Sequence, residues 1–361
     1  MKKLLFYIDS MQMGGANRVM ANLTEYFSSL CYSVILVNDI RTPEGIGEYP
    51  ISSKVKRLFI MDKTDNGNRI GKNINRIKKL RKLLKEEKPD VAISFMGPPN
   101  GRLLIASIGL KTKVIVSVRN DPYREYGKGI RKRIANMLFH LADGCVFQTK
   151  DAAAYFDKRI RRKSQIILNP VREEFYSIKR QTNPQNIISV GRLFPQKNHA
   201  LLIQAFAQVA DKYPKEKLII YGEGELRSEL QDLITELNLQ DRVILPGQST
   251  NIPQILSNTK VFVLSSDYEG MPNALMEAMA AGVPVIATDC PCGGSRTLIE
   301  NSDQGILVAC GNVEHFANAL QNVLGDDELR KRMSTEGKMR AEKFCPNVIF
   351  KQWEMYVKSF F

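Results

Sequence analysis

The sequence is poor in the residues that build metal, redox and disulfide sites. It has only three histidines, at positions 140, 199 and 315, and its six cysteines include no CxxC pair. We interpret Cys290 and Cys292 as small buried thiols, with a metal or redox pair as the alternative. No DxD motif or His/Asp cluster occurs, so we expect an activity that needs no metal ion. Unpaired cysteines are typical of the cytoplasm, where we expect the protein to be.

Long apolar runs are also missing. No stretch of eighteen apolar residues occurs, so the sequence predicts no membrane-spanning helix. The N-terminal run that Asp9 ends is too short for a signal peptide, and we interpret it as a first strand. With 361 residues, of which 43% are hydrophobic, the chain can bury two cores, which favours two domains.

Acidic residues are outnumbered in one half of the chain only. Residues 1–170 contain 32 Lys and Arg against 15 Asp and Glu, a net charge of +17, whereas the remainder has a net charge of −3. A basic first half predicts an anionic partner, either nucleic acid or an anionic membrane. Nucleic acid is disfavoured, because the basic residues are not interleaved with aromatic residues that look exposed.

Two basic amphipathic helices in this half favour a membrane surface. In the first, at 72–88, the apolar stripe consists of Ile74, Ile77, Leu80 and Leu84. In the second, at about 128–142, the apolar residues are expected to point inward and the basic ones outward. The expected inward residues are Ile130, Ile134, Met137, Leu138 and Leu141, and the outward ones are Arg131, Lys132 and Arg133. A sheet-packing helix with a solvated basic face is the alternative for each.

Short apolar runs alternate with helical patterns along the whole chain. The strands expected in the first half are 2–9, 34–37, 91–95, 113–117, 146–147 and 166–167. The strands expected in the second half are 187–190, 218–221, 243–245, 261–264 and 284–287. This alternation predicts an α/β fold of two Rossmann-like doubly wound domains facing across a cleft. We assign 1–170 to the first domain and 171–345 to the second, followed by a helix at about 346–361.

One strand–loop–helix–strand unit of the second half carries two carboxylates. Glu269 lies in its loop, and Glu277 lies on the helix that Pro272 is expected to begin. A helix N-terminus attracts phosphate, because its N–H groups are unpaired and carry partial positive charge. Carboxylates repel phosphate, so the two glutamates are suited to accept hydrogen bonds from hydroxyl groups on either side of it. That order of groups describes a nucleotide sugar, and two ordinary glutamates are the alternative.

Further loops follow strands at the same expected edge. Arg192 and Lys197 place a forked donor and a compact charge in one loop, as a diphosphate needs. Gly222 and Gly247 follow the next two strands, where small residues let a planar base lie against the backbone. In the first half, a turn containing Gly14 and Gly15 follows the first strand. It allows the close approach of a phosphate or sugar, and a tight turn without a ligand is the alternative.

Five motifs resemble one family across nearly the whole chain. GGAxRV, VGRLxxQKN, YGxGxL, LPGxxxNIP and SxxEGMPNxLMEAMAxGxPVIATDCPxGG are similar to family 4 glycosyltransferases of the GT-B fold. The resemblance implies a donor nucleotide sugar on the second domain, an acceptor on the first, and a last helix that crosses back to the first domain. It also implies retention of the anomeric configuration without a metal ion.

The resemblance also implies roles for individual residues. Glu277 would bind the ribose and Glu269 the donor-sugar hydroxyls, while Arg192 and Lys197 would bind the diphosphate. The other donor-binding residues implied are Gly14, Gly15, Gly191, Gly222, Gly247, Gly270, Met271, Pro272 and Asn273. Many family members have a histidine where this chain has Arg119 and Asn120. We carry Arg119 over as catalytic, with acceptor-side contacts from Asn100, Asn120 and Asp121.

The sequence therefore predicts a glycosyltransferase that moves a hexose or N-acetylhexosamine from a UDP-sugar. The expected acceptor is a polyprenyl-diphosphate-linked glycan of a bacterial capsule, exopolysaccharide or O-antigen, reached at the inner face of the cell membrane. No residue has the features of a nucleophile, so we favour a front-face displacement in which the leaving phosphate helps deprotonate the acceptor. The alternatives are a nucleotide-sugar epimerase of the same fold and a basic nucleic-acid-binding protein.

Overall fold

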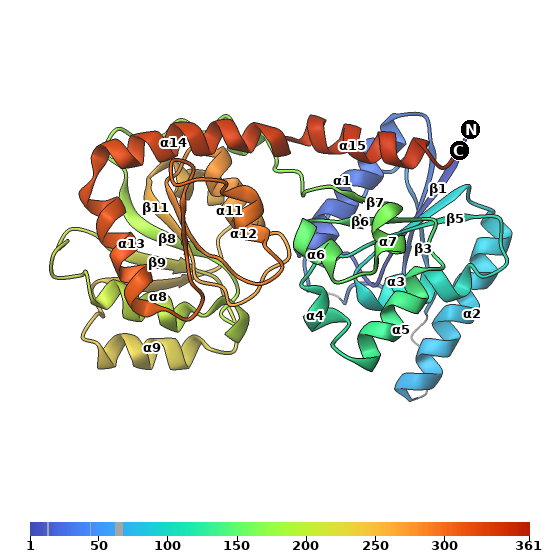
Figure 1. The fold of residues 1–361 in the computed structure, drawn as a ribbon, viewed down its shortest axis with the longest axis horizontal. Helices are drawn as coiled ribbons and strands as arrows, with labels where there is room; N and C mark the ends of the chain where they lie inside the picture. The colour runs from blue at the N-terminus through green and yellow to red at the C-terminus, as the bar shows by residue number, and fades with distance from the viewer. Residues whose placement is uncertain (13, 44, 62–67) are drawn as a thin grey trace. The chain divides into compact units, whose positions relative to one another are not determined.

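The computed structural model describes residues 1–12, 14–43, 45–61 and 68–361. It consists of two compact units, each described here by itself (Figure 1). Unit 1 comprises Met1–Asn169 and Ile349–Phe361, and unit 2 comprises Pro170–Val348. Each unit contains one parallel sheet between helices, which confirms the predicted fold of two doubly wound α/β domains. The first unit ends one residue earlier than predicted.

Unit 1 contains a seven-stranded sheet in the order β3-β2-β1-β4-β5-β6-β7. Its strands are β1 Lys3–Ile8, β2 Ser33–Asn38, β3 Lys56–Phe59, β4 Val91–Phe95, β5 Lys113–Ser117, β6 Gly144–Phe147 and β7 Ser164–Ile166. Its helices are α1 Gly15–Ser29, α2 Arg69–Glu87, α3 Gly97–Ala106, α4 Pro122–Glu125, α5 Ile130–Phe139, α6 Lys150–Ala154 and α7 Lys158–Arg162. The strand order reverses between β1 and β4, so the ligand edge of this unit lies where those two strands end.

Unit 2 contains a six-stranded sheet in the order β10-β9-β8-β11-β12-β13. Its strands are β8 Gln185–Val190, β9 Leu218–Tyr221, β10 Val243–Gly247, β11 Thr259–Leu264, β12 Val285–Thr288 and β13 Ile306–Val308. Its helices are α8 His199–Ala207, α9 Arg227–Glu236, α10 Ile252–Ser257, α11 Asn273–Ala280, α12 Gly294–Leu298, α13 Val313–Gly325 and α14 Asp327–Ala341, with 3₁₀ turns η1 Glu173–Phe175, η2 Pro195–Lys197 and η3 Glu342–Phe344. Here the order reverses between β8 and β11, where the loops with Arg192 and Glu269 begin.

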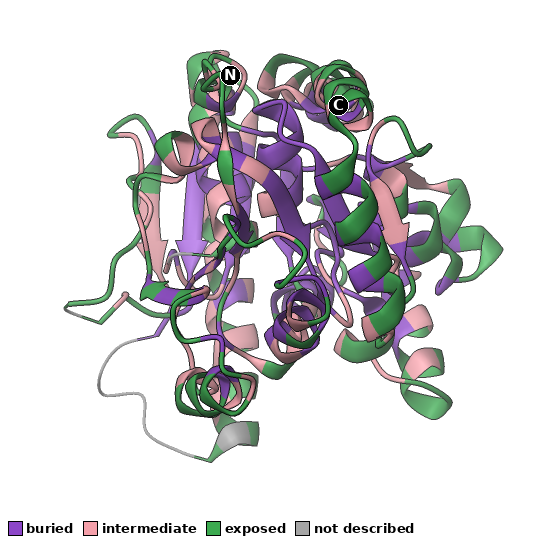
Figure 2. Cartoon of the chain, turned by 90° about the vertical axis from the view of Figure 1, so that its left-hand side faces the viewer, coloured by how far each residue is buried: buried purple, intermediate pink, exposed green. Residues whose placement is uncertain are grey.

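Both sheets are buried on their two faces, which explains why most central strands are uninterrupted apolar runs (Figure 2). Every residue of β4 is buried, and so are all four of β12. The covering helices keep one apolar face inward and one polar face outward. Among the described residues, no helix is long and apolar enough to cross a membrane.

The C-terminal helix α15, Pro346–Lys358, packs on unit 1. Trp353 is fully buried, and its ring lies 5.7 Å from that of Phe95 at the end of β4. The Tyr356 hydroxyl donates to the carbonyl oxygen of Lys163 at 2.6 Å and accepts from the backbone N–H of Cys145 at 2.9 Å. The helix that the sequence places at about 346–361 therefore completes the core of the first unit.

Two predicted features of unit 1 are wrong. Ile130, Ile134, Met137 and Leu141 do not face inward, because Ala135 and Phe139 form the buried face of α5. Directly after the strand expected at 91–95 the sequence predicts a loop at Gly97–Asn100, but Pro98 and Pro99 occupy the first turn of α3.

The sequence analysis also missed the edge strand β3. It is short, and two of its four residues are basic, so it lacks the apolar run that marks a strand.

Candidate active site

The loops after β8, β9 and β10 are joined by backbone hydrogen bonds. The N–H of Gly191 donates to the carbonyl oxygen of Tyr221 at 2.9 Å, and the N–H of Gly222 donates to that of Gly247 at 2.9 Å. A Cβ at position 222 would lie 1.9 Å from the carbonyl oxygen of Gly191, so only glycine fits there. The structure thus brings together three predicted glycines at the carboxyl edge of the unit 2 sheet.

The loop before α8 and the loop before α11 are also bonded to each other. Gln196 accepts from the N–H of Asp267 through its carbonyl oxygen at 2.9 Å, and its side chain donates to the carbonyl oxygen of Tyr268 at 2.9 Å. The Asn198 side chain donates to Asp267 Oδ1 at 2.9 Å. Sequence reasoning missed these polar residues, although their position directly after strands was a usable signal. They fix the Arg192 loop relative to the Glu269 loop.

Glu269 and Lys197 form an ion pair inside this assembly. Lys197 Nζ lies 2.5 Å from Glu269 Oε1, which also accepts from the Ser266 hydroxyl at 2.8 Å. Glu269 is 7% exposed, so the pair is largely shielded from water. An ammonium group has three donors, so Lys197 can hold Glu269 and still donate to an anionic oxygen. Two residues predicted to contact different parts of a donor are therefore in direct contact.

Arg192 differs from Lys197 in being exposed. Its Cζ atom lies 5.0 Å from the ring centroid of Phe194, so the guanidinium stacks on an aromatic face. This contact holds the Arg192 side chain against the Phe194 ring. The arginine thus provides a forked donor at the rim of the site.

Helix α11 begins directly after the Glu269 loop. Pro272 is its N-cap and, within the part of the chain that the structure describes, makes no side-chain cap hydrogen bond. A helix end of this kind attracts anions. Gly270, Met271 and Asn273 flank the cap, and Glu277 lies one turn further on, with an exposed fraction of 6%. These groups together suit a ligand that has both hydroxyl groups and a diphosphate. Glu269 can accept hydrogen bonds from the hydroxyls, and Arg192, Lys197 and the α11 N-terminus can bind the diphosphate.

Two further groups of this unit, His199 and Cys290, are buried. His199 begins α8, and burial lowers the pKa of its imidazole to about 4. All six cysteines are free thiols, and Cys290 is buried, which raises the pKa of its thiol to about 12. Both groups are therefore neutral near pH 7.

The predicted acceptor-side residues of unit 1 are largely engaged in structure. Asn100 is fully buried, and its amide accepts from Ser94 at 2.7 Å and donates to the carbonyl oxygen of Ser117 at 2.9 Å. Asp121 caps α4 by accepting from the N–H of Tyr123 at 2.9 Å. The Asn120 side chain accepts from the N–H of Asp121 at 2.9 Å. In the remaining loop, Gly15 begins α1 and Gly14 precedes it as the N-cap.

Arg119 is also held within unit 1. Its Cζ atom lies 3.9 Å from the Phe95 ring centroid, and Nη1 donates to Asn169 Oδ1 at 2.9 Å. Only 8% of the residue is exposed, and burial lowers the pKa of its guanidinium to about 9. The position that the sequence analysis treats as catalytic is thus a buried cation stacked between aromatic rings of β4 and α15.

A charged cluster at the ends of β1 and β2 was missed by the sequence analysis. Arg102 donates to Asp9 at 2.6 Å and also contacts Asp39, while the Tyr7 hydroxyl donates to Asp39 at 2.6 Å. Asp9 and Asp39 each follow a strand directly, which is the signal that could have found them. Asp9 is about half exposed, so this cluster offers a carboxylate at the ligand edge of unit 1.

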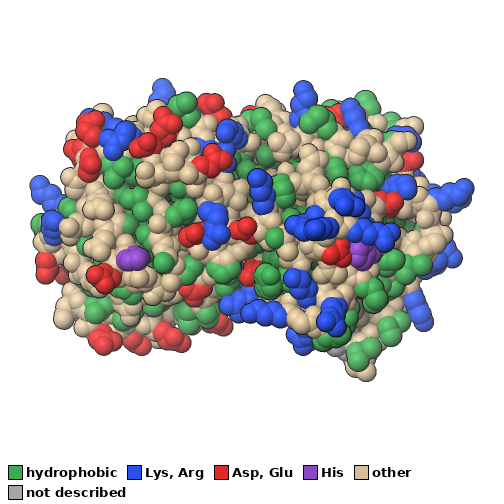
Figure 3. All heavy atoms as spheres, in the orientation of Figure 1, with side chains coloured by type: hydrophobic (Ala, Val, Ile, Leu, Met, Phe, Trp, Pro, Cys, Tyr) green, Lys and Arg blue, Asp and Glu red, His purple; other side chains and the backbone are tan. Residues whose placement is uncertain are grey.

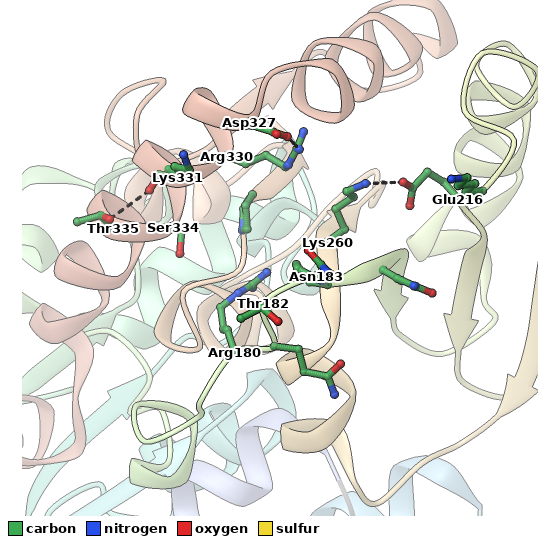
Figure 4. Close-up of a pocket in the computed structure, with 15 residues that line it drawn as sticks. Arg180, Thr182, Asn183, Glu216, Lys260, Asp327, Arg330, Lys331, Ser334 and Thr335 are labelled. Carbon is green, nitrogen blue, oxygen red and sulfur yellow. Dashed lines mark hydrogen bonds and ion pairs between the residues drawn. The ribbon is translucent and has the colours of Figure 1, made fainter.

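A hollow of about 890 Å³ lies on the other edge of the unit 2 sheet (Figure 4). It is lined by residues at the amino ends of β8 and β11 and by one side of α14. Figure 4 shows that its charges are mostly paired: Lys260 lies 2.5 Å from Glu216, and Arg330 contacts Asp327. Because ligands of such folds bind at the carboxyl ends of the strands, the candidate active site remains at the opposite edge.

Two doubly wound units, with glycine loops and a buried helix glutamate at the carboxyl edge of one sheet, define the GT-B class of glycosyltransferases. Family models for glycosyl transferases group 1 and glycosyltransferase family 4 match residues 171–340 and 13–175. The chain belongs to this glycosyltransferase family, as the sequence resemblance predicted, and is an enzyme of the glycosyl-transferring class.

Full-length relatives support this assignment. The N-acetylgalactosamine-N,N'-diacetylbacillosaminyl-diphospho-undecaprenol 4-alpha-N-acetylgalactosaminyltransferase of Campylobacter jejuni is 32% identical over 95% of this chain and 96% of the relative. An uncharacterized glycosyltransferase of Methanocaldococcus jannaschii is 30% identical over 80% of this chain and 84% of the relative.

Solved structures share the fold at lower identity. Sucrose-phosphate synthase from Thermosynechococcus elongatus superimposes with a TM-score of 0.84 and 17% identity, over 99% of both chains. Anabaena HepE, solved in complex with UDP and glucose, gives a TM-score of 0.80 and 19% identity, over 99% of this chain and 100% of HepE.

Proposed function

We propose that this protein is a retaining glycosyltransferase that moves a sugar from a UDP-sugar to a polyprenyl-diphosphate-linked glycan. The observation that carries the proposal is the assembly of Arg192, Lys197, Glu269 and the N-terminus of α11 on bonded loops of unit 2. Supporting it, the Campylobacter relative is named for a diphospho-undecaprenol acceptor, and HepE was solved with UDP.

In this proposal each group meets the part of the donor that its chemistry suits. Glu277 accepts hydrogen bonds from the ribose hydroxyls, and Glu269 accepts them from the sugar. Arg192, Lys197 and the α11 N-terminus hold the diphosphate, and they stabilise the negative charge that grows on it as the glycosidic bond breaks. The base lies against the turns at Gly222 and Gly247.

The chemical step follows from the lack of a suitable nucleophile among these groups. Glu269 is committed to Lys197 and Ser266, so we assign it to positioning the donor sugar rather than to attack. The acceptor hydroxyl forms the new bond on the face that the diphosphate leaves, and its proton passes to a leaving-phosphate oxygen. The product retains the anomeric configuration, and the charge of the leaving group is met by the two cations and the helix dipole.

The membrane contact of this proposal rests on α5 and the charge of unit 1. Ile130 and Met137 on α5 are 67% and 64% exposed, and Ile134 and Leu141 extend the same stripe. Arg131 and Arg133 of this helix are exposed as well. Figure 3 shows Lys and Arg side chains gathered over the face of unit 1 that contains α5 to α7. Apolar residues beside exposed cations suit insertion at the surface of an anionic leaflet, which we place at the inner face of the cell membrane.

Binding of UDP tests the donor assignment directly. Because a ligand that binds only the folded state stabilises it, UDP at a hundredfold excess over its Kd should raise the stability by about 2.7 kcal/mol. A thermal-shift titration with UDP, GDP and free uridine measures this. Stabilisation by none of the three, or by GDP alone, would overturn the UDP-sugar assignment.

A further inference from the structure

A cavity of about 310 Å³ in unit 1 lies between the start of α3, the end of α4 and one side of α5. It is separate from every residue assigned above to the donor. Pro98, Ile134, Leu138 and Phe139 give it a mostly apolar wall, and Glu125 and Arg131 are its charged residues. Its volume is at the lower end of the range found for small-ligand pockets. α3 and α4 follow β4 and β5, so the cavity is at the ligand edge of unit 1.

Glu125 has an unused oxygen at this cavity. Its Oε1 accepts from the N–H of Gly97, whereas Oε2 is buried and has no hydrogen-bond partner among the described residues. Burial raises the pKa of this carboxyl to about 7. A buried acceptor without a partner costs free energy of folding. Such a group is retained at a site where a ligand supplies the missing donor.

Gly101 provides a second, independent observation. It lies in the middle of α3, where alanine would stabilise the helix. No atom lies within 4 Å of the position that a Cβ of Gly101 would occupy. Packing within the protein therefore does not require glycine here, and the glycine keeps the cavity open.

Backbone strain marks the same place. Met96 joins β4 to α3 with a φ of +74°, a conformation that non-glycine residues rarely adopt. Strain of this kind clusters at binding sites. The strained backbone, the unpaired oxygen of Glu125 and the unfilled space beside Gly101 together indicate that the cavity is a binding site and not a packing defect.

We propose that this cavity binds the acetamido group of an N-acetylated sugar in the acceptor glycan. The acetamido N–H donates to Glu125 Oε2, the methyl group packs against Ile134 and Leu138, and the carbonyl oxygen accepts from Arg131. A fully hydroxylated ring would leave several hydroxyls facing carbon atoms, which is unfavourable. The inference rests on the proposed function, because it assigns the site to the acceptor.

Binding of simple glycosides tests this without requiring turnover. The probes are the methyl α-glycosides of N-acetylglucosamine and N-acetylgalactosamine, with those of glucose and galactose as counterparts, added to the full chain and followed by saturation-transfer NMR. We expect the N-acetylated glycosides to bind the wild type at least tenfold more tightly than the counterparts. Gly101→Ala, which places a methyl group in the cavity, and Glu125→Gln, which replaces the unpaired oxygen by an NH₂ donor, should each weaken this binding at least tenfold. Glu86→Gln, on the exposed side of α2, should leave it unchanged.

The melting temperature separates loss of the site from loss of the fold. Gly101→Ala should melt at the same temperature as the wild type or higher, so weak binding by this variant cannot be explained by unfolding. The inference is overturned if no N-acetylated glycoside binds, if the counterparts bind equally well, or if both variants keep the wild-type affinity. A protein that binds these glycosides but transfers no sugar would instead contradict the proposed function.

Discussion

Arg192 and Lys197 are two cations of one loop that have different surroundings and different roles. Lys197 is part of a shielded ion pair with Glu269, whereas Arg192 is exposed and stacks on Phe194. The ion pair of Lys197 thus holds two loops together even without a ligand. Arg192 is not held in this way, so its guanidinium is the cation that would form an ion pair with a bound diphosphate.

Replacing Arg192 should therefore affect catalysis more than stability. We expect Arg192→Ala to lower kcat about a hundredfold or more, because a donor to the leaving group is lost. Its free energy of unfolding should change by no more than about 0.5 kcal/mol, as for other exposed positions. Arg332→Ala, at an exposed arginine of α14, is the matched control and should keep wild-type turnover. Turnover of Arg192→Ala equal to that of the control would remove Arg192 from the site.

Glu125 should make stability depend on pH. Its folded-state pKa of about 7 lies above the ordinary value of 4.5, so the folded state binds this proton more tightly than the unfolded state. The wild type should accordingly lose stability as the pH rises from about 4.5 through 7. Glu125→Gln has no charge to bury, so at pH 8 it should be more stable than the wild type by about 2–3 kcal/mol.

Denaturant unfolding of Glu125→Gln and wild type at pH 5 and pH 8 measures this difference. At pH 5 the wild-type carboxyl is mostly protonated in the folded state, so the advantage of the glutamine should nearly vanish. An advantage of equal size at both pH values would show that burial of the charge is not its cause.

The sequence predicted which residues lie close together in the site wherever their position depends on the order of strands and loops. The glycine turns and the Arg192, Lys197 and Glu269 loops meet at one edge, because parallel strands carry the residues after them to the same side. Which individual side chains are buried was harder to predict from the sequence. Arg119 and Asn100 follow strands too, but Trp353, more than 200 residues later, and the two prolines of α3 determine their surroundings.

Among the elements, α5 shows why amphipathic pattern alone was insufficient. Its sequence contains two candidate apolar faces, and the period of 3.6 residues does not determine which one meets the sheet. The structure buries Ala135 and Phe139 and leaves the larger face exposed. We propose this face, together with the basic residues beside it, as the membrane contact.

Polar substitutions on that face should weaken membrane binding without unfolding the protein. We expect Ile130→Ser combined with Met137→Ser to reduce binding to vesicles containing phosphatidylglycerol at least tenfold, because two exposed apolar side chains no longer enter the leaflet. Co-sedimentation measures the bound fraction. The control is Met339→Ser, at an exposed methionine of α14, which should bind vesicles like the wild type. Equal binding by the α5 variant and the control would exclude α5 as the contact.

At the scale of the whole molecule, charge and chemistry are divided between the units. Unit 2 carries the groups suited to a diphosphate donor, and the basic residues concentrate in the first half of the chain. The charge of the first half predicts that vesicle binding weakens as salt rises from 50 mM to 500 mM, because the Debye length then falls well below 10 Å. Binding that is insensitive to salt would mean that the apolar stripe acts without the basic residues.

The central claim is that the protein transfers a sugar from a UDP-sugar to a lipid-linked glycan, and it is tested most directly by measuring that transfer. A panel of radiolabelled UDP-hexoses and UDP-N-acetylhexosamines is incubated with the wild type, or with Glu277→Ala, and vesicles containing a polyprenyl-diphosphate-linked N-acetylated sugar. We predict that at least one donor labels the lipid fraction with the wild type, and that Glu277→Ala reduces this labelling at least a hundredfold. Release of free sugar regardless of acceptor, or equal labelling by the variant, would contradict the account.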